Sequence, residues 1–150
     1  RGLGDVYKRQ SLYFERYFGY QKAMMMQGLT VLPSVALEKP EDYMAFDDIL
    51  HQNNATALVV IDDIFALRTM QLAQIYGYQV PETLSIISFN NSIFSTLTHP
   101  YLTSIDIDTS ELGRMAMTQL YELIHEELTN GVRLVIPHKL IKRETVIPIH

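Results

Sequence analysis

The sequence has no cysteine, which excludes disulfides, zinc–thiolate sites and thiol nucleophiles. It also has no apolar run near the roughly 18 residues that a membrane-spanning helix needs. The first residues, "RGLGDVYKRQ", carry no signal-peptide pattern. These absences are typical of a protein that works in the reducing cytoplasm without contact with a membrane.

Positive charge is scarce as well. The chain has 12 Lys and Arg residues against 17 Asp and Glu residues, for a net charge of −5 at pH 7. A surface that binds nucleic acid carries clustered basic side chains that neutralise phosphates, whereas most of the basic residues here are scattered. We therefore expect that the chain alone does not bind DNA specifically. Apolar residues make up 47% of its 150 residues, which is ample for a packed core.

Motifs for cofactors and catalysis are missing too. No G-x-G-x-x-G or Walker A loop is present for a dinucleotide or a triphosphate, and no G-x-S-x-G elbow is present for a hydrolase. The histidines lie far apart and lack the spacing of metal ligands; they are His51, His99, His125, His138 and His150. We predict no cofactor, no metal ion and no catalytic residue, and hence a protein that is not an enzyme.

Helical and strand patterns alternate along the chain. Apolar residues recur at three and four positions in the predicted helices, and short apolar runs without alternation mark buried strands. The predicted helices are 12–27, 41–52, 64–76 and 109–128, the last opened by the capping pair Asp108 and Glu111. The predicted strands are 29–33, 57–61, 84–89 and 102–107, followed by two strand-like pieces broken at Pro137. This order predicts an α/β fold with a doubly wound parallel sheet.

Polar pairs follow two of the predicted strands. Asp62 and Asp63 come after one strand, and Asn90 and Asn91 come after the next. In open α/β sheets, ligands bind beyond the carboxyl ends of the strands, and paired carboxylates and amides can bind the vicinal hydroxyls of a sugar. Two alternatives remain open: the acidic pair can cap the following helix, and the amide pair can simply form a turn.

Five segments together resemble the lactose-repressor (LacI/GalR) family of bacterial transcription regulators. They are, in order, "RYFGYQKAM", "TALVVIDDIFAL", "YGYQVPETLSIISFNNS", "YLTSIDIDTSELGRMAM" and "KLIKRET". They match the family's Arg-x-x-Gly helix, its Asn-Asp strand end, its Val-Pro to Phe-Asp-Asp strand, its Leu-Gly helix and its Leu-Val-x-Arg-x-Ser terminus. Each segment is weak by itself, but their common order and spacing over residues 15–145 are highly specific.

The resemblance implies a periplasmic-binding-protein-like effector core with two Rossmann-like lobes, which works as a dimer. Residues 11–103 would form most of the C-terminal lobe, 104–136 a return segment of the N-terminal lobe, and 137–150 the final strand and tail of the C-terminal lobe. Residues 1–10 lack the apolar strand that the family has there, and we interpret them as a truncation or non-native segment. The family's helix-turn-helix, through which operator DNA would be bound, lies outside the sequence.

The resemblance also implies a function and a set of site residues. The protein would be a sugar-responsive transcriptional repressor, and this chain its effector-binding and dimerisation part. Arg16, Asp62 and Asn90 would bind the sugar, while Asp63 and Asn91 would add to the site or act as caps, with Asp63 assigned to the helix cap. Helix 64–76 carries apolar residues beyond one stripe and therefore needs a second partner. We expect this helix and loop 93–101 to contribute to the dimer surface, in particular through Leu67, Leu72, Phe94 and Tyr101; the alternative is that the second side of the helix meets a neighbouring helix of the same lobe.

The sequence departs from the family at both strand ends. Asp62-Asp63 stands where the family has Asn-Asp, and Asn90-Asn91 stands where it has Asp-Asp, so acid and amide are exchanged. The string "SFNNS" most resembles maltose-operon repressors, which makes maltose or a short maltodextrin the favoured effector. Two alternatives remain: a secreted sugar-binding protein of the same fold, and a small α/β enzyme that uses Asp62 and Asp63 around Mg²⁺.

Overall fold

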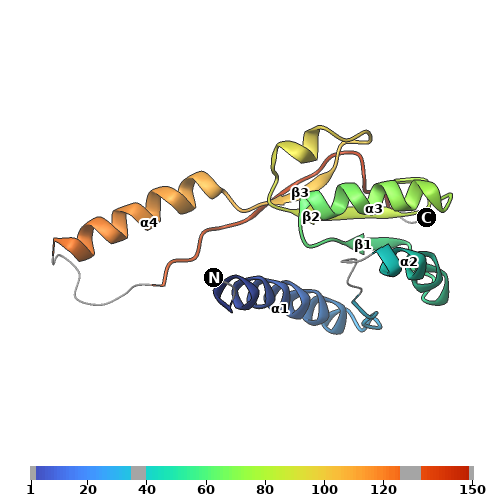
Figure 1. Cartoon of the computed structure of the whole chain (residues 1–150), viewed down its shortest axis with the longest axis horizontal. Coiled ribbons are helices and arrows are strands. Elements are labelled where there is room, and N and C mark those ends of the chain that lie inside the picture. Colours follow the sequence, from blue (N-terminus) through green and yellow to red (C-terminus); the bar gives the residue numbers. More distant parts are fainter. Residues whose placement is uncertain (1–2, 35–39, 126–132, 149–150) are drawn as a thin grey trace. The chain divides into compact units, whose positions relative to one another are not determined.

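The computed structural model describes residues 3–34, 40–125 and 133–148 (Figure 1). The chain divides into two compact units, Arg1–Ala55 and Thr56–His150.

The first unit contains two helices, α1 (Leu3–Met26) and α2 (Pro40–Gln52). Helix α1 begins at Leu3, earlier than residue 12, where helical periodicity becomes clear in the sequence. It is followed by Gly28 at a positive φ of 67°, in agreement with the predicted stop. Helix α2 begins at Pro40, as the sequence predicts, and buries Phe46 and Leu50.

The predicted strand 29–33 is wrong, because this segment has no regular structure. This segment and the residue after it form hydrogen bonds with tyrosine side chains of α1 instead. The Leu32 amide donates to the hydroxyl of Tyr20 (3.0 Å), and the hydroxyl of Tyr13 donates to Ser34 Oγ (2.5 Å). A strand exists only with a neighbour that accepts its amides, and none of the sheet strands pairs with this segment.

The second unit is built on a four-stranded sheet in the order β1-β2-β3-β4 (Figure 1). The strands are β1 (Ala57–Val59), β2 (Ser85–Phe89), β3 (Thr103–Asp106) and β4 (Lys139–Ile141). The first three are parallel, and β4 is antiparallel to β3. The predicted α/β fold with a parallel sheet is therefore confirmed.

Burial differs between the strands. Strand β2 lies inside, with Ile86 and Ser88 fully buried. We expected strand 57–61 to be buried on both faces as well, and this is wrong, since β1 is shorter and Val59 is 55% exposed. Strand β1 has one partner, β2, in the described sheet, so its other edge is not covered by a strand.

Helix α3 (Asp63–Ile75) contacts β2 and buries Ala66, Leu72 and Ala73. Its end follows the left-handed C-terminal pattern, in which a glycine with positive φ lets amides beyond the helix bond back to its last carbonyls. Gly77 has a φ of 83°, and the Tyr78 amide donates to the Ala73 carbonyl (2.8 Å). The predicted helix and its glycine stop are confirmed.

Helix α4 (Thr109–Ile124) begins at the predicted cap, where Asp108 Oδ1 accepts from the Glu111 amide (3.0 Å). Asp108 itself donates its amide to Asp106 Oδ1 (2.9 Å), and the Glu111 carboxylate binds Arg114 (2.5–2.8 Å). The helix ends at Ile124, before the predicted end at residue 128. The predicted stop at residues 130–131 lies outside the described residues.

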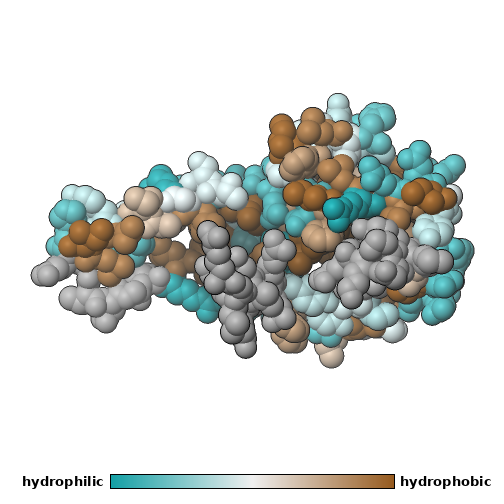
Figure 2. Space-filling model, in the orientation of Figure 1, coloured by the Kyte–Doolittle hydropathy of each residue, from teal (hydrophilic) through white to brown (hydrophobic). Residues whose placement is uncertain are grey.

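No residue of α4 is buried. Its apolar side chains therefore lie on the surface, as Figure 2 shows over this helix. They include Leu112, Met117, Leu120, Tyr121, Leu123 and Ile124. Such a stripe needs a partner surface. That this surface belongs to the N-terminal lobe stays a prediction.

The C-terminal segment forms one strand rather than two. Residues 133–138 have no regular structure, so only the second of the predicted strand-like pieces is present, as β4. Among the helices in the described part of the chain, none combines the length and the apolarity that crossing a bilayer demands.

Candidate functional site

The polar pairs predicted at the strand ends lie at one edge of the sheet. Because β1 and β2 are parallel neighbours, the residues that follow them are at the same edge. Their proximity is direct, since the carboxylate of Asp63 binds both the amide and the hydroxyl of Ser92 (2.6 and 2.7 Å). The sequence thus predicted where the polar residues gather, although it did not predict how they bond.

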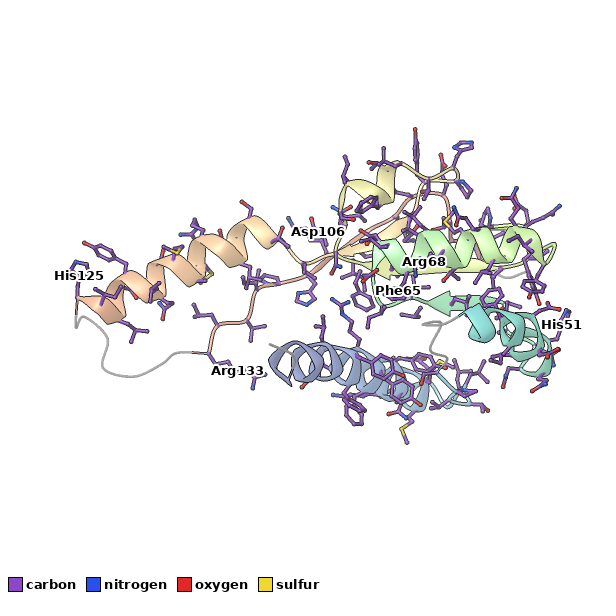
Figure 3. The ribbon with its side chains drawn as sticks, in the orientation of Figure 1. His51, Phe65, Arg68, Asp106, His125 and Arg133 are labelled. Atoms are coloured by element: carbon purple, nitrogen blue, oxygen red, sulfur yellow. The ribbon has the colours of Figure 1, made fainter. Side chains whose placement is uncertain are left out.

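Asp62 is the N-cap of α3. Its backbone is extended, with a φ of −156°, and its Oδ1 accepts from the amide of Phe65 (2.8 Å), a residue labelled in Figure 3. The assignment of the cap to Asp63 is therefore wrong. The extended residue just before the first helical turn takes the cap, and here β1 ends early enough for Asp62 to occupy that position.

Asp63 is buried, with 1% of its surface exposed. Its Oδ1 accepts from the hydroxyls of Ser88 (2.5 Å) and Ser104 (2.7 Å), while its Oδ2 accepts from the amide and the hydroxyl of Ser92. A carboxylate has about four lone-pair positions, so these four donors fill them. The start of α3 also favours the negative charge.

Asn90 and Asn91 form the turn that the alternative interpretation expected. Both have positive φ, 99° and 46°, which is uncommon outside glycine but tolerated by asparagine. The Asn90 amide donates to the Ile105 carbonyl (2.8 Å), and the Asn91 amide donates to Ser104 Oγ (3.0 Å). The turn is therefore attached to β3 at both residues.

The side chain of Asn91 is held by the protein. Arg143 donates through Nη2 to Asn91 Oδ1 (2.6 Å) and through Nη1 to the Leu102 carbonyl (2.7 Å). Ser95 Oγ makes a longer contact, at 3.4 Å, with the same amide oxygen. Asn91 thus has a structural role within the turn.

Sequence reasoning did not select Arg143 or Thr145 as residues near the site. Thr145 is fully buried: its hydroxyl donates to the Ile86 carbonyl (2.6 Å) and accepts from the Thr103 amide (2.9 Å). The string "KLIKRET", which contains both residues and matches the family's Arg-x-Ser terminus, could have pointed to them. No local pattern indicates that these side chains reach β2 and β3.

The third predicted sugar ligand, Arg16, lies half-buried on α1, in the first unit. The other two ligands, Asp62 and Asn90, lie in the second unit. The convergence of all three on one sugar stays a prediction.

The residues predicted for the dimer surface differ in exposure. Phe94 and Tyr101 are 38% and 45% exposed, and Leu67 is half-buried. Leu72 is 9% exposed and belongs to the core of its own unit. A groove of about 720 Å³ lies between α3 and the loop after the short 3-10 helix η1 (Ile93–Thr96), and its lining includes Leu67, Met70, Tyr78, Leu97, His99 and Pro100.

The possible metal ligands around Asp62 and Asp63 do not favour the alternative of a magnesium-dependent enzyme. Within the residues that the structure describes, no three His, Asp or Glu side chains gather in a group that could hold a metal ion. The carboxylate of Asp63 is already filled by hydroxyl and amide donors, and Mg²⁺ would need oxygen ligands that are not engaged in this way.

Comparison with known proteins identifies the family. Residues 4–146 match the family described as "Periplasmic binding protein-like domain". The HTH-type transcriptional repressor PurR of Pasteurella multocida is 35% identical in an alignment of 136 positions that covers 87% of this chain and 41% of the repressor. The chain therefore spans about two-fifths of that relative.

Solved structures give the same result. The transcription regulator CcpA of Lactococcus lactis has a TM-score of 0.77 at 30% identity and covers 90% of this chain, which spans 51% of that structure. A complex of the transcriptional regulator CelR with cellobiose has a TM-score of 0.78 at 26% identity, over 88% of this chain and 42% of the regulator. These relatives are transcription regulators rather than enzymes, as the sequence predicts. These regulators are similar to this chain over about two-fifths to one half of their own length. The chain belongs to the periplasmic binding protein-like domain family.

Proposed function

We propose that the full-length protein is a cytoplasmic, sugar-responsive transcriptional repressor and that this chain supplies part of its effector site and its dimer surface. The observation that carries the proposal is the gathering of Asp62 and the Asn90-Asn91 turn at one edge of a parallel sheet. Operator DNA would be bound by a helix-turn-helix outside this chain, because the chain itself has a net charge of −5.

Each proposed ligand suits a sugar hydroxyl in a different way. The cap uses Oδ1 of Asp62, so a hydroxyl can donate to its Oδ2. The side-chain amide of Asn90 can donate through its NH2 group and accept through its oxygen. The planar guanidinium of Arg16 can donate two bonds to adjacent hydroxyls. Asp63 and Asn91 are removed from direct contact in this proposal, because their side-chain oxygens bind Ser92 and Arg143.

The effector that we propose is a glucoside of the maltose type. It is supported by the string "SFNNS", which resembles maltose-operon repressors. The complex of the regulator CelR with cellobiose supports the broader class of glucose disaccharides. Maltose and cellobiose differ in the configuration of one glycosidic bond, so they form an informative pair of probes.

Calorimetry on the full-length protein tests the site. We expect one of the two disaccharides to bind, and we expect Arg16→Ala, Asp62→Ala and Asn90→Ala each to weaken its binding by about 1–3 kcal/mol, because a buried partner loses its hydrogen bond. Asp62→Asn is the matched control for the cap, since an asparagine oxygen also caps a helix. Unchanged affinity in all three alanine variants would remove the site assignment while leaving the family assignment intact.

The dimer surface that we propose is formed by α3 and residues 93–101. It is supported by large apolar side chains that are exposed there, notably Leu97 at 68% and Ile93 at 67%. Figure 2 shows hydrophobic side chains on the surface over η1. A single copy would leave these side chains in water, whereas a second copy would cover them. Sedimentation of the full-length Phe94→Asp and Leu97→Asp variants tests this: we expect monomers, and dimers at the same concentration would contradict the proposal.

A further inference from the structure

Asp63 bonds directly to Ser92, which follows the Asn90-Asn91 turn, and is linked to Asn91 through Ser104. The Ser92 amide donates to its Oδ2 at 2.6 Å. The Asn91 amide reaches it through one hydroxyl, because Ser104 Oγ accepts from that amide (3.0 Å) and donates to Asp63 Oδ1 (2.7 Å). One buried carboxylate thus receives the hydrogen bonds of two neighbouring amides, the second by way of Ser104.

The turn needs such support because its backbone is strained. Asn90 and Asn91 have φ values of 99° and 46°. Non-glycine residues persist in these regions only where surrounding contacts determine them. The Asn90 backbone amide also donates, to the Ile105 carbonyl. The backbone amides of three consecutive residues, Asn90, Asn91 and Ser92, are therefore all hydrogen-bonded.

The same carboxylate connects the turn to Asp62. Asp63 is the first residue of α3, and Asp62 is its cap, so the two share one rigid helix start. Strand β2 joins the network through Ser88, whose hydroxyl donates to Asp63 Oδ1 (2.5 Å). Asp63 therefore links the helix start that carries Asp62 to the segment that follows Asn90.

We propose that Asp63 is a positioning residue for effector binding: it does not contact the effector but fixes the turn so that Asn90 faces the same ligand as Asp62. What Asn90 contacts rests on the function proposed above, whereas the fixing of the turn does not. A site held in its binding geometry before the ligand arrives avoids the cost of ordering on binding.

Three variants of the full-length protein separate positioning from packing. Asp63→Asn replaces one carboxylate oxygen by an NH2 group that cannot accept, so two of the four donors lose their acceptor. Ser104→Ala removes the hydroxyl that links Asp63 to the backbone amide of Asn91. Ser88→Ala is the matched control, because Ser88 and Ser104 are both fully buried on neighbouring strands and both donate to the same oxygen. Only Ser104 also accepts from the turn.

Hydrogen exchange followed by mass spectrometry reads the turn directly, without a ligand. We expect exchange to accelerate about tenfold in Asp63→Asn at Asn91 or at Ser92, depending on which carboxylate oxygen the NH2 group replaces, and to accelerate as much at Asn91 in Ser104→Ala, from the loss of one hydrogen bond. Ser88→Ala should leave both amides at the wild-type rate. If exchange at these amides is unchanged in Asp63→Asn and in Ser104→Ala, the proposal is overturned. Should Asp63→Asn not fold, Ser104→Ala decides alone.

Calorimetry with maltose and cellobiose then tests the link to the effector. We expect Ser104→Ala and Asp63→Asn to bind the sugar about tenfold more weakly than wild type, and Ser88→Ala to bind it like wild type. Equal losses in Ser88→Ala and Ser104→Ala would mean that the network only supports the sheet, and would overturn the proposal. If the wild type binds neither sugar, the proposed effector fails, and the exchange rates still decide whether Asp63 holds the turn.

Discussion

Thr145 offers the sharpest test of how the second unit is held together. Strands β2 and β3 pair directly from Ile87 and Thr103 onward. Just before that point, Thr145 lies between them. Its hydroxyl donates to the Ile86 carbonyl and accepts from the Thr103 backbone amide. The Ile86 backbone amide donates in turn to the Thr145 carbonyl (2.8 Å). Thr145→Val keeps the shape of the side chain and removes both hydroxyl bonds.

The magnitude follows from burial. Thr103 is 1% exposed and Ile86 is fully buried, so water cannot replace the lost hydroxyl. A buried donor without a partner costs about 1–3 kcal/mol, and the lost bond to the carbonyl adds about 1 kcal/mol. The extra methyl of valine offsets about 0.8 kcal/mol of this. We expect a net loss of about 1–3 kcal/mol in the free energy of unfolding.

Urea unfolding of the full-length protein measures this loss, with Thr145→Ser as the control. Serine keeps both hydroxyl bonds and removes one buried methyl, which costs about 1 kcal/mol. We expect valine to lower the urea midpoint more than serine does. A valine variant as stable as the wild type, or more stable than the serine variant, would refute the assignment of the hydroxyl as a required bridge.

Three further perturbations test other parts of the structure. Asn91→Asp should turn the contact with Arg143 into an ion pair and raise the free energy of unfolding by about 0.5–1 kcal/mol at low salt, with the gain shrinking as salt is added; an increase that does not depend on salt would contradict this. Gly77→Ala should lower the free energy of unfolding by about 1 kcal/mol in urea titrations, because its φ of 83° disfavours a side chain although space is open there. The hydrogen bonds and charge of Arg114 hold the pKa of Glu111 below 4.5, so the stabilisation from this pair is complete above that pH and is lost as the pH falls through the lowered pKa. Arg114→Ala should therefore raise the pKa of Glu111 in an NMR titration, and an unchanged pKa would show that the pair is not formed in solution.

Local patterns in the sequence were sufficient where the determinant is local. The ends of α3 follow from a carboxylate before the helix and Gly77 after it, and the start of α4 follows from Asp108. Local patterns were insufficient where the structure of a segment depends on contacts with residues elsewhere in the chain. Segment 29–33 has the apolar residues of a strand, but its amide at Leu32 bonds to Tyr20. Strand 57–61 reads as buried on both faces, although burial depends on layers that are not encoded in those residues.

The site shows the same division. That polar residues gather after β1 and β2 follows from the order of strands and from the rule for parallel sheets. Which of two adjacent carboxylates caps the helix depends on where the strand ends, and one residue of difference moved the cap from Asp63 to Asp62. The bonds of Arg143 and Ser104 to the turn join residues far apart in sequence, so no spacing pattern within either segment could reveal them.

The hold of Arg143 on Asn91 has a consequence for the order in which the protein is made. The two residues are separated by 52 positions, and Thr145 and Ile86 by 59. On the ribosome, the turn emerges long before the arginine that binds its side chain and the threonine that joins its strands. Contacts between distant residues form late, so the strands can form early in a nascent chain. The turn at Asn91 takes its final set of contacts only after the segment beyond β4 has been synthesised and has packed back onto the sheet.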